Sequence, residues 1–134
     1  MSTKLNASVE AAVENLHACF SDSEILVESD GNGGARVAVE TVQLSDAYVQ
    51  PETWIAGHLV PQLPYADIYP LFVRGDLARR DGRPLGGGLS SGQIFLGRSA
   101  VQASRRSNRR DPALELAGHK FLKVIEWLRT HPGT

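Results

Sequence analysis

The pattern of apolar and polar positions predicts a helix near each end of the chain. Near the N-terminus, apolar residues recur three or four positions apart, and either Asn6 or Ser8 can cap the helix that they predict. These apolar residues are Val9, Ala12, Val13, Leu16 and Phe20. One side of this helix is therefore expected to pack on the rest of the protein.

A second apolar stripe runs toward the C-terminus, with stronger signals at its two ends. Asp111 suits an N-cap, Pro112 suits the first helical position, and Glu115 suits the first turn. The stripe consists of Leu114, Ala117, Phe121, Val124, Ile125 and Leu128. The His-Pro-Gly run at 131–133 is typical of a helix end, so we expect a helix between Asp111 and that run.

Between the two helices the pattern changes to short runs of β-forming residues. The runs 25–28 and 35–44 flank a Gly/Asn/Asp cluster at 30–34, which predicts a hairpin. Two more strands are expected within 53–64 and 68–77, because each apolar run there is bounded by proline or glycine. Together these runs predict a four-stranded antiparallel meander.

The stretch 78–92 is rich in turn-forming residues, with Asp81-Gly82 and three glycines at 86–88. It is followed by a short apolar element at 93–97 and then by an arginine-rich segment. The predicted fold class is α+β: an N-terminal helix, a four-stranded antiparallel meander, a long irregular segment and a C-terminal helix, with the helices packed on the sheet.

Composition narrows the class of protein. The chain has 134 residues, 42% of them apolar and 22% charged, which is ordinary for one globular domain spanning 1–134. Its formal net charge of −1 provides no general attraction to nucleic acid or anionic membranes. No apolar run reaches the ~18–20 residues that span a bilayer, and the N-terminus has no apolar signal region. We expect a cytoplasmic protein without a nucleic-acid or membrane partner.

The single cysteine, Cys19, excludes an internal disulfide and agrees with a reducing compartment. It lies beside the apolar stripe of the first predicted helix, so we expect it in or near the core. A reactive thiolate needs a cationic neighbour or a helix N-terminus, and Cys19 comes late in its helix.

Familiar catalytic motifs are absent from the sequence. The histidines at 17, 58, 119 and 131 are scattered, the glycine run lacks the Gly-Lys-Ser/Thr of a phosphate loop, and no Gly-x-Ser-x-Gly occurs. We therefore expect no metal and no cofactor, and we interpret His119 and His131 as surface or helix-cap residues.

An arginine cluster is the densest charge feature: Arg98, Arg105, Arg106, Arg109 and Arg110. It is interpreted either as a solvated loop or as a surface that binds an anion or a partner, since guanidinium groups match carboxylates and phosphates. Ser104 and Ser107 lie among these arginines, whose charge could stabilise an oxyanion. A serine nucleophile also needs a base, and the nearest candidates are Asp111, Asp81 and His119.

The order of elements and three local motifs resemble a small, divergent ubiquitin-conjugating-enzyme domain over almost the full chain. The Tyr69-Pro70 pair matches a Tyr-Pro pair of that family, although the further prolines are missing. Gly92, Ile94 and Leu96 match the family's Gly-x-Ile-Cys-Leu motif, with Phe95 in place of the cysteine. The last predicted helix is also similar, with Arg110 roughly where the family has tryptophan.

This resemblance implies a role in a bacterial ubiquitin-like modification pathway, with a ubiquitin-like protein and an activating-enzyme-like protein as partners. The missing cysteine, and the missing His-Pro-Asn before it, leave two hypotheses. In the first, a serine carries the modifier as an oxyester; Ser104 is preferred, then Ser107, then Ser91. In the second, the domain is inactive and works as a binding adaptor.

In both hypotheses the expected binding residues are Arg105, Arg106, Arg109, Arg110, Tyr69 and Pro70. A small structural or interaction protein without any link to modifiers is a third class, and a nucleotide-binding enzyme is the least favoured because no phosphate loop is present. The residues slightly favour the serine hypothesis over the adaptor hypothesis.

Overall fold

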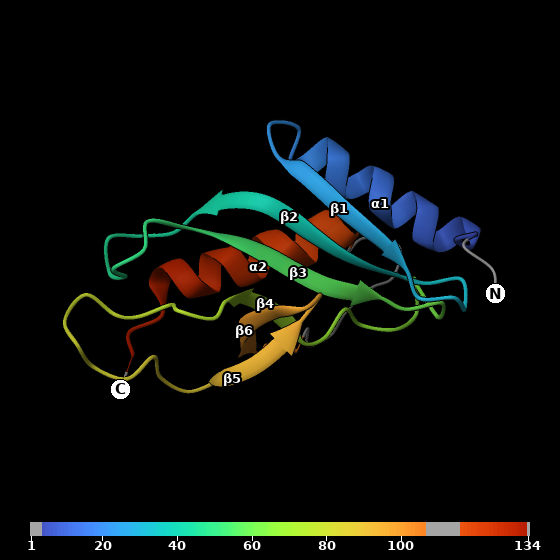
Figure 1. Cartoon of the computed structure of the whole chain (residues 1–134). Coiled ribbons are helices and arrows are strands. Elements are labelled where there is room, and N and C mark those ends of the chain that lie inside the picture. Colours follow the sequence, from blue (N-terminus) through green and yellow to red (C-terminus); the bar gives the residue numbers. More distant parts are fainter. Residues whose placement is uncertain (1–3, 107–115, 134) are drawn as a thin grey trace.

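The computed structural model describes residues 4–106 and 116–133. Two helices and six strands are present in this part of the chain (Figure 1). In chain order they are α1 (Ala7–Cys19), β1 (Glu24–Ser29), β2 (Ala35–Gln43), β3 (Glu52–Leu59), β4 (Leu71–Arg74), β5 (Leu89–Phe95), β6 (Arg98–Ala103) and α2 (Ala117–Thr130). The fold class is α+β, as the sequence predicts.

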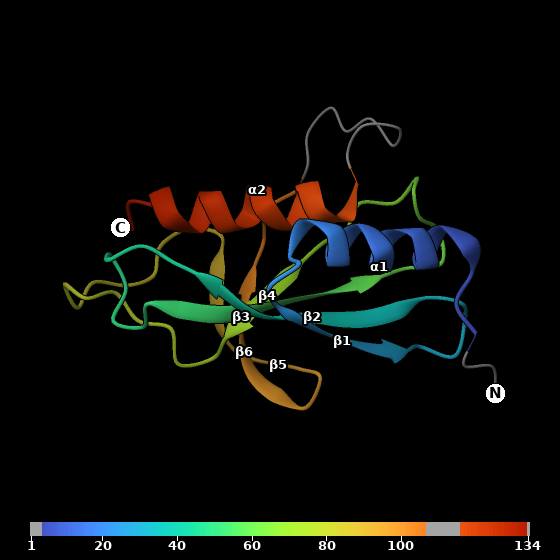
Figure 2. The ribbon, with the colours of Figure 1, turned by 90° about the horizontal axis from the view of Figure 1, so that it is seen from above.

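The six strands form one antiparallel sheet in the order β1-β2-β3-β4-β6-β5. Both helices lie side by side on one face of this sheet, which we call the helix face (Figure 2). Alternate strand residues point to it, so the core forms between the sheet and the helices. Its largest fully buried side chains include Leu16, Ile55, Leu71, Phe121, Ile125 and Leu128.

The first half of the chain follows the predicted pattern. Helix α1 begins after Asn6, whose side-chain oxygen accepts a hydrogen bond from the N–H of Val9 at 2.9 Å. Strands β1 and β2 form the predicted hairpin, in which Gly31 and Gly33 have positive φ angles. The β-branched and aromatic runs become β3 and β4, which continue the sheet.

The predicted strand count is wrong, because the segment expected to be irregular contains two more strands. β5 and β6 form a hairpin whose two-residue turn, Leu96-Gly97, has φ angles of 53° and 73°, as in a type I′ turn. The sequence did not predict this hairpin because the serines and the glycine of 89–92 have low β propensity. β6, not β5, pairs with β4 and buries Val101 and Ala103 in the core.

The start of the last helix also differs from the prediction. Leu116 has an extended backbone, with φ −87° and ψ 170°, so α2 begins at Ala117 instead of after Asp111. Asp111, Pro112, Leu114 and Glu115 lie outside the described residues. A tertiary contact marks the new start: the N–H of Gly118 donates to the side-chain oxygen of Asn15 in α1 at 2.6 Å. The remaining residues of the predicted stripe are buried, as expected.

Cys19 is exposed, which contradicts its expected place in or near the core. Helix α1 turns Val9 and Leu16 toward the sheet, whereas Cys19 lies against Gly118 at the edge of the contact between the two helices. A Cβ atom at Gly118 would collide with the sulfur of Cys19, so a glycine is what allows the two helices to approach here.

The other side of the sheet, which we call the outer face, is covered in part by the tip of the β5–β6 hairpin. The ring of Phe95 stacks on Phe72 of β4 with centroids 4.4 Å apart, and the guanidinium of Arg98 lies 4.6 Å from the ring centre of Trp54. Arg98 also forms an ion pair with Glu40. Three small residues of this face, Ala38, Ala56 and Ala100, are 0–1% exposed.

Candidate binding site

A site-like region lies where three segments meet at one end of the helix face: the loop 60–70 between β3 and β4, the end of β6, and the first turns of α2. Lys120 of α2 is only 2% exposed, and its Nζ lies 3.2 Å from each carboxylate oxygen of Asp67. The same Nζ donates to the backbone oxygen of Arg105 at 2.6 Å. Because a buried charge is tolerated only when it is paired, these contacts hold the three segments together.

This arrangement brings together four of the predicted binding residues. The guanidinium of Arg106 lies 3.9 Å from the centre of the Tyr69 ring, within the range of a cation–π contact. Arg105 and Arg106 are exposed, and Tyr69 and Pro70 are half-buried. The site thus presents cationic groups on an aromatic support, whereas Arg109 and Arg110 lie outside the described residues.

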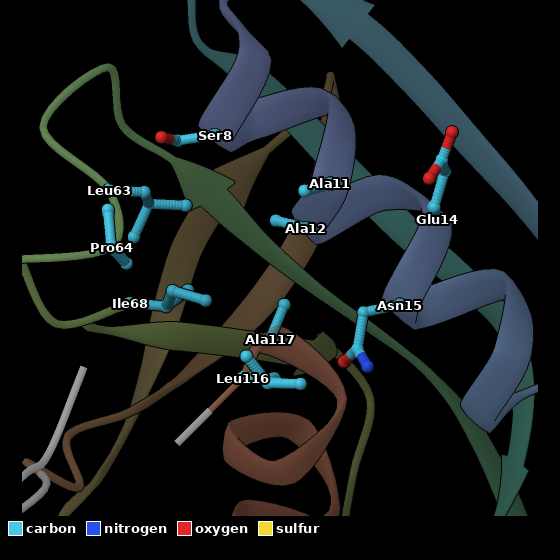
Figure 3. Close-up of a pocket in the computed structure, with 10 residues that line it drawn as sticks. All are labelled: Ser8, Ala11, Ala12, Glu14, Asn15, Leu63, Pro64, Ile68, Leu116 and Ala117. Carbon is cyan, nitrogen blue, oxygen red and sulfur yellow. The ribbon is translucent and has the colours of Figure 1, made fainter. Parts of the chain in front are cut away.

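An open cavity of about 500 Å³ lies beside the same loop, between the loop and α1 (Figure 3). Its wall is mostly apolar, with Ser8 and Asn15 adding polar side chains, whereas the side chain of Glu14 points away from it. The apolar part consists of Ala11, Ala12, Leu63, Pro64, Ile68, Leu116 and Ala117. Since Ile68 lines the cavity and Tyr69 supports Arg106, one loop carries both an apolar and a cationic surface.

The two candidate serines within the described residues lie on β5 and just beyond β6. The hydroxyl of Ser104 accepts a hydrogen bond from Nε2 of Gln102 at 3.0 Å, and its N–H donates to the carbonyl of Gly88 at 2.7 Å. Ser91 is exposed, at an irregularity of the β5–β6 pairing. No His, Asp, Glu or Lys of the described ranges hydrogen-bonds either hydroxyl. Ser107 lies outside those ranges.

The two proposed bases within the described residues, Asp81 and His119, are engaged elsewhere. Asp81 binds Arg83 at 2.9 Å, and the backbone N–H and then the guanidinium of Arg83 lower the pKa of this carboxyl, which makes it a weaker base. The Nδ1 of His119 lies 3.4 Å from the N–H of Leu116, a helix-cap contact of the kind expected for this histidine. Asp111 lies outside the described residues.

Sequence reasoning missed an Asp–His pair on the outer face. Nε2 of His58 in β3 lies 2.7 Å from Oδ2 of Asp30, whose side chain is 4% exposed. Oδ1 of Asp30 accepts from the backbone N–H groups of Asn32 and Gly34. The hydrogen bond from His58, helped by these N–H groups, lowers the pKa of Asp30 against the opposing effect of burial. The turn at 30–34 was predicted, but no local pattern links it to His58.

A second unpredicted cluster surrounds Arg79, which is 5% exposed. Its Nη2 donates to the backbone oxygen of His131 at 2.9 Å and lies 3.0 Å from Nδ1 of the same residue. The N–H of Gly133 also donates to that Nδ1, and Nε2 of His131 lies 2.8 Å from the carbonyl of Gly87. Two donors at Nδ1 select the tautomer with its proton on Nε2. His131 is therefore the C-cap of α2, in line with the expected cap role.

Within residues 4–106 and 116–133, no three His, Cys, Asp or Glu side chains gather closely enough to hold a metal ion. A membrane-crossing helix is likewise missing from this part of the chain, because neither helix has the length and apolar character. Comparison of the chain with family models, curated proteins and solved structures finds no match in any of the three.

Proposed function

We propose that this chain is a protein-binding adaptor, an inactive relative of the ubiquitin-conjugating domain that it resembles. Its partner docks on the loop 60–70, with acidic groups at Arg105 and Arg106 and an apolar side chain in the cavity beside Ile68. The observation that carries the proposal is that Tyr69, which supports the exposed guanidinium of Arg106, and Ile68, which lines an open apolar cavity, are neighbours in one loop. A ubiquitin-like protein is the partner that the resemblance implies.

Two further features support an adaptor over a carrier of the modifier. Phe95, in the position of the missing cysteine, belongs to a hairpin that packs on the outer face through Phe72. The hydroxyls of Ser104 and Ser91 also have no basic partner among the described residues, and a serine is a weak nucleophile without a base. These two features therefore favour the adaptor hypothesis over the serine hypothesis.

One observation keeps the serine oxyester as a second candidate function. The Gln102 side-chain amide lies 3.0 Å from the Ser104 oxygen, so a polar donor stands beside the preferred serine. The second N–H of this amide, which the Ser104 oxygen does not accept, could then donate to the oxyanion that forms during acyl transfer.

The two functions are separated by the intact mass of the chain after incubation with ATP, a bacterial ubiquitin-like protein and the activating enzyme of that protein. An unchanged mass, together with a stable complex in size-exclusion chromatography, is expected for the adaptor. An adduct that resists thiols, yields to mild hydroxide and is lost in Ser104→Ala would overturn the adaptor and establish the oxyester.

The docking surface is tested on the same complex with Arg106→Glu. Reversing this charge is expected to weaken binding about tenfold or more, since it replaces an attraction by a repulsion. Arg83→Glu is the matched control, because Arg83 is an exposed arginine that pairs locally with Asp81 in another loop. Equal binding by the two variants would show that Arg106 is not part of the interface. A chain that binds none of these proteins would belong to the class of small structural proteins.

A further inference from the structure

Strand β1 is an open edge of the sheet. It pairs only with β2 within the described residues, and the sheet order ends with it on that side. Natural edge strands are usually protected by charged side chains, above all lysine, by proline or by a bulge. β1 has the sequence EILVES, with two glutamates but no lysine, proline or bulge, whereas the opposite edge strand, β5, has an irregular register at Ser91 and Gly92. The two edges of the sheet are therefore not equivalent.

The hydrogen bonds at the hairpin show which backbone groups of β1 point outward. The N–H of Asp30 donates to the carbonyl of Gly34, and this pair continues the register of β1 and β2. In an antiparallel pair, alternate residues exchange both hydrogen bonds. Even-numbered residues of β1 therefore bond to β2, and Ile25 and Val27 direct their N–H and C=O groups away from the sheet.

The side chains of this edge present apolar surface on both faces. Leu26, on the outer face, is 41% exposed, and Val27, on the helix face, is 43% exposed. A hollow of about 270 Å³ lies beside Leu26, between β1 and the tip of the β5–β6 hairpin, where Leu96 and Arg98 line it. A strand added to β1 would place a side chain next to Leu26 and extend the outer-face cluster.

The charged side chains of β1 itself are both acidic, whereas Arg36 and Arg98 beside it are cationic. Residues 5–35 contain six carboxylates and no lysine or arginine: Glu10, Glu14, Asp22, Glu24, Glu28 and Asp30. Glu24, Leu26 and Glu28 alternate on the outer face of β1. Arg36 stands opposite Glu28 in β2, and the residue opposite Glu24 is Glu40, which is engaged with Arg98. Of the two glutamates of β1, Glu24 is therefore the one with less positive charge near its carboxylate.

The same charges disfavour a second copy of this chain on the edge. Antiparallel self-pairing centred on Leu26 would place Glu24 opposite Glu28 twice. Pairing centred on Val27 would place Glu24 opposite Asp30 and Glu28 opposite Leu26. Like charges directly opposite one another destabilise a strand pair, so the edge selects a strand of different composition.

We propose that β1 binds an extended segment of a partner protein by strand addition, and that this segment has a basic-x-apolar-x-basic pattern. Its backbone bonds to Ile25 and Val27, its two basic side chains face Glu24 and Glu28, and its apolar side chain packs beside Leu26 and Leu96. This surface is separate from the loop 60–70, and the inference does not depend on the proposed function.

The probe is a fluorescent, end-capped peptide, Thr-Lys-Val-Leu-Thr-Lys-Thr, with an otherwise identical peptide that has glutamate in place of both lysines. Binding is followed by fluorescence anisotropy and by the amide NMR signals of residues 24–28. The lysine peptide is expected to bind about tenfold more tightly than the glutamate peptide, as two cross-strand charge pairs predict. Its signal changes should be centred on Ile25 and Val27.

Two variants test the mechanism. Val27→Pro removes an outward N–H, which an edge strand tolerates, and should abolish binding while the circular dichroism spectrum is kept. The double variant Glu24→Lys, Glu28→Lys should reverse the preference and bind the glutamate peptide, with Glu24→Lys contributing more than Glu28→Lys. Such a gain of binding cannot come from unfolding. Glu126→Lys, on an exposed position of α2, makes the same change in net charge as either single variant and should keep the preference.

Three results would overturn the proposal. One is equal binding of both peptides to the native chain, and another is an unchanged preference in the double lysine variant. The third is self-association in sedimentation equilibrium that Val27→Pro abolishes, because the edge would then be occupied by a second copy.

Discussion

The two faces of the sheet are covered in different ways. On the helix face, α1 and α2 cover large aliphatic side chains of the sheet such as Ile55 and Leu71, and the residues in contact are far apart in the sequence. On the outer face, the buried residues are small alanines. Half-buried aromatic rings and the charged side chain of Arg98 pack over them. The helix face resembles an ordinary core, whereas the outer face depends on stacking and ion pairs.

This difference shows what the segment 91–106 does for the fold. The stretch Gly92–Gly97 is the part that resembles a conjugating-enzyme motif, and it forms the tip of the hairpin that covers the outer face. Its Phe95 contributes an aromatic ring to packing, which a cysteine would not replace. The comparison of the two faces leads to four predictions, given from the largest expected effect to the smallest.

Truncation of the helix face should be the most damaging change. Phe121→Ala removes a fully buried ring, so we expect the free energy of unfolding to fall by about 3–5 kcal/mol. Urea unfolding measures this loss. Leu122→Ala, at the neighbouring position with 43% exposure, is the control and should cost less than about 1 kcal/mol. Equal losses in the two variants would contradict the assignment of α2's buried side.

Phe95→Ala should have a smaller and more local effect. The ring is half-buried and stacks on one partner, so we expect a loss of about 1–2 kcal/mol. Hydrogen exchange should become faster in β5 and β6 while α2 remains protected. Ile94→Ala, at a neighbouring position with 75% exposure, should leave both measurements nearly unchanged. A loss as large as that of Phe121→Ala would mean that the two faces form one cooperative core.

The outer face should respond to acid through Asp30. The pKa of Asp30 is lowered in the fold, chiefly by the hydrogen bond from His58. A lowered folded-state pKa stabilises the protein above the pKa of an unfolded aspartate, about 3.9, and this contribution is lost as the pH falls through the folded value. Asp30→Asn should therefore cost about 1 kcal/mol at pH 7 and flatten the loss of stability below about pH 4.

Urea midpoints measured between pH 3 and pH 7 provide this test. Asp22→Asn, which changes an exposed carboxyl outside the strands, should preserve the acid response of the native chain. An unchanged acid response in Asp30→Asn would show that the Asp30–His58 pair does not contribute to the loss of stability in acid.

Leu96→Asn should produce the smallest effect, a gain in stability. Leu96 has a positive φ of 53°, a conformation that asparagine adopts more readily than leucine, and Asn-Gly is the preferred type I′ turn. We expect the free energy of unfolding to rise by about 0.5 kcal/mol, measured by thermal unfolding. A loss of stability would show that the packing of Leu96 over the outer face outweighs its backbone strain.

Much of the helix face could be predicted because its patterns are local. The spacing of Val9 and Leu16 predicted α1, the cap at Asn6 was one of the two proposed, and the Gly-rich turn predicted the β1–β2 hairpin. The β5–β6 hairpin could not be recognised, because serine and glycine there have low β propensity and its turn contains a leucine at positive φ. Its stability comes from pairing with β4, which is distant in the sequence.

The candidate site was predicted in part. The sequence identified Arg105, Arg106, Tyr69 and Pro70 as binding residues, and the fold brings these four together, although their role remains a prediction. The cavity and the buried Lys120–Asp67 pair were not predicted, since each joins residues about fifty positions apart. The same is true of Asp30 and His58, because hydrogen bonds between distant side chains leave no periodic pattern.

The sequence by itself determined the α+β class, the two amphipathic helices, the first four strands and the arginine-rich segment, because local spacing and turn chemistry control these features. Only the tertiary structure decided that the stretch around Phe95 covers the outer face, that Cys19 is exposed, and that β1 is left as an open edge. These outcomes depend on which strand pairs with which and on which face each element packs against. Such choices are made by long-range burial and hydrogen bonding, and no short stretch of the chain encodes them alone.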